Sequence, residues 1–189
     1  MKNVEKLKKY MRPGQAYRRQ SLKGVTTDVD RDLQKLVCAN VVKKLSAGLY
    51  YRPKKNAFGD HPPENSDIVK AFLKTDDFLL TSYNHFNQLS LGLTQLYNNT
   101  VVYNHKRTGN FRLGGKRFFF RVVPSFPHKL SKEFLLVDFL NNLHRLPDNT
   151  SLALHNLKSH LRNFNREKLE KQLSKYGRPS ALRAYQTYA

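Results

Sequence analysis

Residues 26–52, TTDVDRDLQKLVCANVVKKLSAGLYYR, decide how the start of the chain folds. The first half of this stretch places apolar side chains at the spacing of one buried helical face. These side chains are Val29, Leu33, Leu36 and Val37. The second half holds two short β-prone segments, Val41–Leu45 and Leu49–Arg52, joined by a loop that contains Gly48. The stretch therefore predicts a helix followed by a β-hairpin.

Two further helical segments are expected before this stretch. Residues 3–11 carry apolar side chains at helical spacing and predict the first helix. Residues 18–23 predict a short second one, which Gly24 ends. Three helices followed by a hairpin is the layout of a winged helix-turn-helix, in which the third helix enters the major groove and the hairpin contacts the DNA backbone or the minor groove. The sequence therefore predicts a DNA-binding module in residues 1–55.

The residues expected to contact DNA follow from that layout. Base edges are expected to meet the residues at the start of the third helix, which are Thr26, Thr27, Asp28 and Arg31. Gln34 lies beside the exposed face and is a further candidate for DNA contact. Phosphates are expected to meet the cations Arg18, Arg19, Lys35, Lys43, Lys44 and Arg52. A basic helix can also be only a solvated surface, and three acids on this helix argue against phosphate contact along its whole length.

The charge balance supports a nucleic-acid partner. The 189 residues include 34 Lys and Arg against 14 Asp and Glu, which gives a formal charge of +20. A field of this sign attracts phosphate backbones. The single cysteine, Cys38, excludes an internal disulfide and a multi-cysteine zinc site. Because it lies at the end of the apolar helix face, it is expected to be a small buried apolar residue. The sequence contains no apolar run of bilayer length and no secretory signal, so a cytoplasmic protein without membrane contact is expected.

The charge is distributed unevenly along the chain. Residues 1–55 hold 15 basic and 4 acidic residues, residues 56–157 hold 11 and 8, and residues 158–189 hold 8 and 2. The Pro- and Gly-containing segment Pro53–Pro63 favours a linker. We therefore expect three parts: a DNA-binding domain over 1–55, an α+β domain over 64–147 and a basic helical tail over 148–189.

The middle part mixes helix and strand signals, so the predicted fold class is α+β. Helices are expected at residues 64–73 and 83–91 and from Ser131 onward, and further helices in the tail at 151–162 and 166–175. Strands are expected at 100–103, 110–113 and 117–123, the last two around a Gly114-Gly115 turn, and residues 78–80 are expected to form a short strand or a helix end. Phe118 and Phe120 are expected on one face of their strand and Phe119 on the other.

The same strands suggest a second hypothesis. Basic residues alternate there with aromatic residues, a composition that can bind single-stranded nucleic acid by charge and stacking. The basic residues are His105, Lys106, Arg107, Arg112, Lys116, Arg117 and Arg121. An RNA-binding module is therefore the alternative function, although the phenylalanines are more simply explained as core residues with the cations facing solvent.

No catalytic motif is recognisable in the sequence. The phosphate-binding loop, the zinc-protease helix and the hydrolase nucleophile elbow are all absent. The seven histidines show no metal-ligand spacing. We therefore expect no enzyme activity, cofactor or metal, and a nuclease with an unrecognised site is the least favoured alternative.

Residues 11–143 also resemble a known family. The stretches RPGQAYRRQSLKGVTTDVDRDLQKLVCANVVKKLSAGLYYRPKKNAFG, TQLYNNTVVYN and EFLLVDFLNNL are similar to AbiEi-type antitoxins of bacterial type IV toxin–antitoxin (abortive infection) systems. The resemblance implies a winged-helix DNA-binding domain followed by an antitoxin domain, and it places the DNA-contacting elements at Thr26–Lys35 and in the hairpin Val41–Arg52. It also implies repression of the protein's own operon through promoter repeats and a cognate nucleotidyltransferase-like toxin. The long C-terminal extension of larger relatives is not expected.

Overall fold

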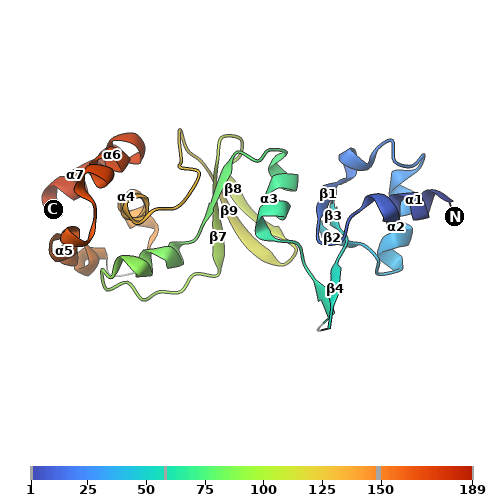
Figure 1. Cartoon of the computed structure of the whole chain (residues 1–189), viewed down its shortest axis with the longest axis horizontal. Helices are drawn as coiled ribbons and strands as arrows, with labels where there is room; N and C mark the ends of the chain where they lie inside the picture. The colour runs from blue at the N-terminus through green and yellow to red at the C-terminus, as the bar shows by residue number, and fades with distance from the viewer. Residues whose placement is uncertain (1, 58, 148–149, 189) are drawn as a thin grey trace. The chain divides into compact units, whose positions relative to one another are not determined.

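The structure is a computed structural model that describes residues 2–57, 59–147 and 150–188 (Figure 1). The chain divides into two compact units. Unit 1 runs to Asp77 and includes Gly109–Phe118, whereas unit 2 comprises Phe78–Thr108 and the chain from Phe119 onward. Helices and strands occur in both units, so the expected α+β class is confirmed.

Unit 1 begins with a small helical and β-stranded assembly (Figure 1). Its elements are α1 (Lys2–Tyr10), β1 (Ala16–Arg18), the 3₁₀ helix η1 (Arg19–Leu22), α2 (Val29–Cys38), β2 (Lys43–Ser46) and β3 (Leu49–Tyr51). The first and third predicted helices and the predicted hairpin are therefore present. The second predicted helix is only a single 3₁₀ turn, and the sequence did not predict β1.

The apolar face of α2 packs on α1. Leu33 and Leu36 are almost fully buried and share a core with Leu7 and Met11. At the start of the helix, the side chain of Asp28 accepts a hydrogen bond from the backbone N–H of Arg31 at 3.2 Å. Such an N-cap satisfies a backbone donor that has no partner within the helix. The core and the cap together fix which face of α2 is exposed.

Strands β1, β3 and β2 form an antiparallel sheet in that order. Tyr51 of β3 lies opposite Ala16 of β1 on one side and opposite Lys43 of β2 on the other. The β2–β3 register shifts between Lys44 and Ser46, as in a β-bulge. The three-residue strand β1 has no alternation long enough for sequence analysis to recognise.

The segment expected as a linker is a second hairpin, so that expectation is wrong. Strands β4 (Lys54–Asn56) and β5 (Gly59–His61) pair antiparallel, with Lys54 opposite His61. All described residues of both strands are exposed, and the hairpin projects from the rest of unit 1 (Figure 1). An isolated two-stranded hairpin is marginally stable in water. An ion pair of 2.9 Å between Lys43 and Asp60 joins it to β2.

Helix α3 (Asn65–Leu73) belongs to unit 1 rather than to the second part of the chain. The guanidinium of Arg18 donates hydrogen bonds to the backbone carbonyls of Ala71, at 2.7 Å, and Phe72. The Phe72 ring also packs at 5.0 Å on that of Phe111. The expected boundary between residues 55 and 64 thus differs from the division between the compact units, because these contacts attach α3 to β1 and β8.

The middle of the chain forms a four-stranded sheet in the order β6-β7-β9-β8. Its strands are β6 (Phe78–Thr81), β7 (Asn99–Asn104), β8 (Gly109–Leu113) and β9 (Lys116–Val122), and the 3₁₀ helix η2 (Tyr83–Leu89) follows β6. The expected alternation in β9 is confirmed, since Phe118 and Phe120 are fully buried while Phe119 is half-buried.

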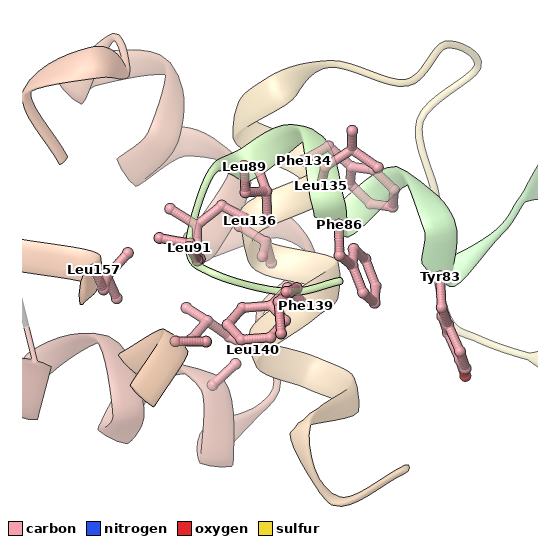
Figure 2. Close-up of a cluster of buried hydrophobic side chains, with 14 of the residues drawn as sticks. Tyr83, Phe86, Leu89, Leu91, Phe134, Leu135, Leu136, Phe139, Leu140 and Leu157 are labelled. Carbon is pink, nitrogen blue, oxygen red and sulfur yellow. The ribbon is translucent and has the colours of Figure 1, made fainter. Parts of the chain in front are cut away.

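Helix α4 (Lys132–Asn142) is the centre of unit 2. Ser131 caps it by accepting a hydrogen bond from the N–H of Phe134 at 3.1 Å. Figure 2 shows how side chains from η2 and α5 gather around α4. Phe86, Phe139 and Leu157 are examples, each no more than 1% exposed.

The C-terminal helices are part of this core. They are α5 (Thr150–His160), α6 (Arg166–Tyr176) and α7 (Pro179–Tyr188), with the 3₁₀ turns η3 (Leu143–Arg145) and η4 (Leu161–Asn163) before α5 and α6. Leu157, Leu169, Leu173 and Ala181 share the apolar cluster of α4. The segment expected as a separate tail therefore packs within unit 2. The expected start of that tail, Asp148, lies outside the described residues.

Candidate nucleic-acid interface

The exposed face of α2 is the best candidate interface in unit 1. Arg31, Gln34, Lys35 and Cys38 are all exposed, and their spacing of three, four and seven residues places them on one side of the helix. Among the described residues, neither Arg31 nor Lys35 has an ion-pair partner. This face therefore presents two uncompensated cations and one amide.

Cys38 belongs to this face, so the expectation that it is buried is wrong. It follows Arg31 by seven residues and Gln34 by four, which rotates it away from the apolar side of the helix. The Nε2 of Gln34 lies 3.6 Å from the Sγ of Cys38. The thiol therefore borders the same polar surface.

Each of the three acids of α2 and its cap has a role that removes it from this face. Asp28 caps the helix, and Asp32 is buried on the inward side. Asp30 accepts a hydrogen bond of 2.6 Å from the Nε of Arg19. This bond lowers the pKa of the Asp30 carboxyl and raises the pKa of Arg19. The acids consequently leave the charge of Arg31 and Lys35 largely uncompensated.

The two threonines expected to meet bases lie just before the N-cap of α2. Thr26 is buried, and its Oγ1 has no hydrogen-bond partner among the described residues. Thr27 is exposed, and its Oγ1 accepts a hydrogen bond of 3.0 Å from the Nδ2 of Asn3 in α1. Thr26 is therefore turned inward, while Thr27 links the two helices.

Several cations expected to meet phosphates are engaged inside unit 1. Arg18 holds the last turn of α3, as described above. The Nη1 of Arg52 donates to the carbonyl oxygens of Lys8 at 2.8 Å and Met11 at 3.3 Å. Such hydrogen bonds from a charged group stabilise the fold. These two arginines act in the structure as connections between elements.

The β2–β3 hairpin divides its two lysines between different roles. Lys43 pairs with Asp60, and this ion pair raises the pKa of Lys43. Lys44 is exposed and has no ion-pair partner among the described residues. Of the expected phosphate contacts, Lys35 and Lys44 are therefore the two that remain available.

Other exposed cations of unit 1 were not singled out by the sequence. Lys2, Lys6 and Lys9 are exposed on α1 at a spacing of four and three residues, and Lys54 and Lys55 are exposed on β4. The sequence predicted helix α1 from its periodicity. It did not predict that Lys54 and Lys55 lie on a strand, because their segment was assigned to a linker.

Strands β8 and β9 are a weaker candidate for a nucleic-acid interface than α2, because their aromatic side chains are buried or half-buried. Phe118 and Phe120 are fully buried, and the guanidinium of Arg121 lies 5.3 Å above the Phe119 ring. Phe111 packs against Phe72. Stacking of bases requires an exposed aromatic face. The arrangement favours phenylalanines that form the core and cations that face solvent.

Within residues 2–57, 59–147 and 150–188, no group of three His, Cys, Asp or Glu side chains could hold a metal ion. In the same part of the chain, no helix combines the length and apolar character needed to cross a membrane.

Comparison with known proteins gives one informative result. No protein-family profile matches the chain, and no curated protein matches it. Among solved structures, the crystal structure of the RV2827C protein from Mycobacterium tuberculosis is similar, with a TM-score of 0.55 and 17% identity. The match covers 96% of this chain and 72% of that one. At this identity, the likeness concerns the fold alone.

Proposed function

We propose that the protein is a DNA-binding transcriptional autorepressor and an antitoxin that counteracts a nucleotidyltransferase-like toxin. The DNA-binding part rests on one observation above all, the exposed face of α2, where Arg31 and Lys35 have no ion-pair partner within the described part of the chain. The antitoxin part rests on the resemblance of residues 11–143 to AbiEi-type antitoxins.

The element order α1-β1-η1-α2-β2-β3 and the three-stranded antiparallel sheet support a winged helix-turn-helix in unit 1. In this proposal α2 is the recognition helix and the β2–β3 hairpin is the wing. A recognition helix must be held by its apolar face and present its polar face to the major groove. The packing of Leu33 and Leu36 on α1 meets the first requirement.

Base reading is assigned to Arg31 and Gln34. Arginine can form two hydrogen bonds with guanine, and glutamine can do so with adenine. Lys35 and Lys44 would neutralise phosphates, which provides affinity without sequence preference. Because Arg19 compensates Asp30, the start of α2 would approach DNA without a free carboxylate at that position.

The test measures binding of the full chain to its promoter and to a random duplex of equal length at several salt concentrations. Arg31→Ala should weaken binding to the promoter more than binding to the random duplex. Lys168→Ala removes one exposed cation from α6 and is the matched control. It should change the affinity for neither the promoter nor the random duplex. Equal losses on both duplexes for Arg31→Ala would place base reading elsewhere.

The antitoxin part is tested separately by expression beside a nucleotidyltransferase-like protein encoded in the same operon. The full chain should restore growth. Arg31→Ala should relieve repression of the promoter while protection against the toxin persists. If the full chain fails to protect, the antitoxin proposal is wrong, whatever the outcome of the DNA-binding experiment.

A further inference from the structure

Unit 2 contains a cavity of about 240 Å³ that the proposed DNA-binding function does not use. It lies among the end of β7, the loop after β9, one side of α4 and the turn between α6 and α7. The lining residues that matter here are Tyr103, Phe126, Phe134, Asp138, Lys175 and Arg178.

The carboxylate of Asp138 is built into this cavity from α4. Its side chain is 2% exposed. The Oδ1 atom accepts hydrogen bonds from the hydroxyl of Tyr103 at 2.6 Å and from the Nδ2 of Asn142 at 2.9 Å. The Oδ2 atom has no hydrogen-bond partner among the described residues. A buried acceptor without a donor is costly, so this atom marks a position where a donor belongs.

The surrounding network holds the carboxylate in place. The Nδ2 of Asn142 also donates to the carbonyl of Asp138 at 2.8 Å and lies 3.1 Å from the Tyr103 hydroxyl. The hydroxyl of Tyr83 donates to the Oδ1 of Asn142 at 3.3 Å. All of these contacts occupy Asn142 or the Oδ1 side of Asp138. No described residue donates a hydrogen bond to Oδ2, and Asp138 is one of the residues that line the cavity.

The walls and the rim supply two further chemical features. Phe126, Phe134 and Tyr176 provide aromatic surface, and Lys175 and Arg178 provide positive charge. Neither cation has an ion-pair partner among the described residues. The α6–α7 turn that carries them is attached to Asn141 of α4, whose side chain accepts from the N–H of Arg178 at 2.8 Å and donates to the carbonyl of Tyr176 at 2.9 Å.

We propose that this cavity binds a nucleoside monophosphate. An amino or ring N–H of the base donates to the Oδ2 of Asp138, the flat base lies against the aromatic walls, and the phosphate pairs with Lys175 and Arg178. No single feature selects this ligand. The combination of a buried acceptor, aromatic walls and two cations selects a flat ring with an N–H donor and an attached anion.

The size of the cavity agrees with this class of ligand. A volume of 240 Å³ corresponds to about eight molecules of liquid water. It lies just below the usual range of pockets for drug-sized molecules. The base is therefore the enclosed part, and the phosphate stays at the rim, where Lys175 is exposed.

The experiment is calorimetric titration of the full chain at pH 8, above the Asp138 pKa of about 7, with GMP, AMP, CMP and UMP, and with ribose 5-phosphate and inorganic phosphate as probes that lack a base. At least one nucleotide should bind at least about tenfold more tightly than ribose 5-phosphate, as expected for a hydrogen bond to a charged group. If ribose 5-phosphate binds equally well, or if no nucleotide binds at millimolar concentration, the proposal is wrong.

Two variants assign the contacts. Asp138→Asn places an amide donor where an acceptor is needed and should lower nucleotide affinity by at least about tenfold. Arg178→Ala should lower the affinity for the nucleotide but not for the corresponding nucleoside. Lys168→Ala is the matched cation control and should bind as the parent does. Unchanged nucleotide affinity in Asp138→Asn would overturn the proposal.

A readout on the parent protein covers the case in which Asp138→Asn does not fold. Nucleotide added to isotope-labelled full chain should shift the backbone resonances of Phe126, Asp138 and Arg178, while those of Arg31 and Lys35 in α2 stay in place. Shifts at α2 alone would show that the nucleotide binds the DNA-contacting face, and the proposed cavity site would be rejected.

Discussion

Helices α2 and α4 have nearly the same length, 10 and 11 residues, but they are buried to different extents. Helix α2 buries Val29, Leu33 and Leu36 on one side and exposes Arg31 and Lys35 on the other. In α4, every residue from Phe134 to Leu140 is buried. A helix with one polar face can offer side chains to a partner at the surface, whereas a helix that is buried from Phe134 to Leu140 organises the core around it.

The acids of the two helices show the same contrast. Asp30 of α2 is exposed, and its hydrogen bond from Arg19 lowers its pKa. Asp138 of α4 is buried, and desolvation raises its pKa to about 7 despite the hydrogen bonds from Tyr103 and Asn142. One residue type thus becomes a surface ion pair in unit 1 and a proton-binding group in unit 2, because the solvent exposure differs.

The largest expected difference concerns core truncation. Phe139→Ala removes a fully buried ring from α4 and should lower the free energy of unfolding by about 3–5 kcal/mol. Gln34→Ala on the exposed face of α2 should change it by no more than about 0.5 kcal/mol. Urea unfolding of both variants measures the contrast. A loss below about 1 kcal/mol for Phe139→Ala would show that α4 is not the centre of the core.

The second expected effect is a pH dependence of the free energy of unfolding, caused by Asp138 of α4. Because the folded pKa of Asp138 is about 7, above the ordinary 3.8, the native state holds a proton that the unfolded state releases between these values. The free energy of unfolding should therefore fall as pH rises from about 4 to about 7, by at most about 1.4 kcal/mol per pH unit.

Asp138→Asn should remove this slope and be more stable than the parent protein at pH 8. Urea unfolding across this pH range measures the difference between the two proteins, in which the contributions of other titrating groups cancel. The same pH dependence in both would refute the assignment to Asp138.

A third prediction compares two arginines of unit 1. Arg18→Ala removes hydrogen bonds to the last turn of α3 and should lower the free energy of unfolding by about 1.5–3 kcal/mol. Arg31→Ala should leave stability unchanged within about 0.5 kcal/mol. Thermal unfolding of the two variants distinguishes a structural cation from an available one. Equal stability of both would contradict the role assigned to Arg18.

Arg31→Ala is expected to act on DNA instead. It should reduce the preference for the promoter over a random duplex by about 1–3 kcal/mol, if Arg31 forms a bidentate contact with a base. Fluorescence anisotropy with both duplexes measures this preference. Arg18→Ala, tested where it remains folded, should keep the preference.

The smallest effect on DNA binding is expected for the lysines of the β2–β3 hairpin. Lys44→Ala should weaken binding to all duplexes evenly and reduce the slope of log affinity against log salt by about 0.9, the value for one phosphate contact. Lys43→Ala should reduce the slope less, because Asp60 already compensates that charge. A larger effect at Lys43 would indicate that its ion pair with Asp60 opens on binding.

Local patterns in the sequence determined the elements that depend on neighbouring residues. The apolar spacing of Val29, Leu33 and Leu36 was sufficient to locate α2, and Ser131 ahead of an apolar run was sufficient to locate the start of α4. The Gly114-Gly115 turn likewise located the β8–β9 hairpin. Periodicity and capping act within a few residues, so they can be read from the chain itself.

Tertiary structure alone decided which charged groups are available. The sequence predicted that Arg18 and Arg31 both contact DNA, but Arg18 meets backbone carbonyls 53 and 54 residues away and Arg31 meets solvent. The short strand β1 exists through its pairing with β3, and the C-terminal helices join unit 2 because their leucines reach α4. The cavity at Asp138 depends on partners from β7 and the α6–α7 turn. Contacts over such distances are fixed by packing, which leaves no periodic signal in the sequence.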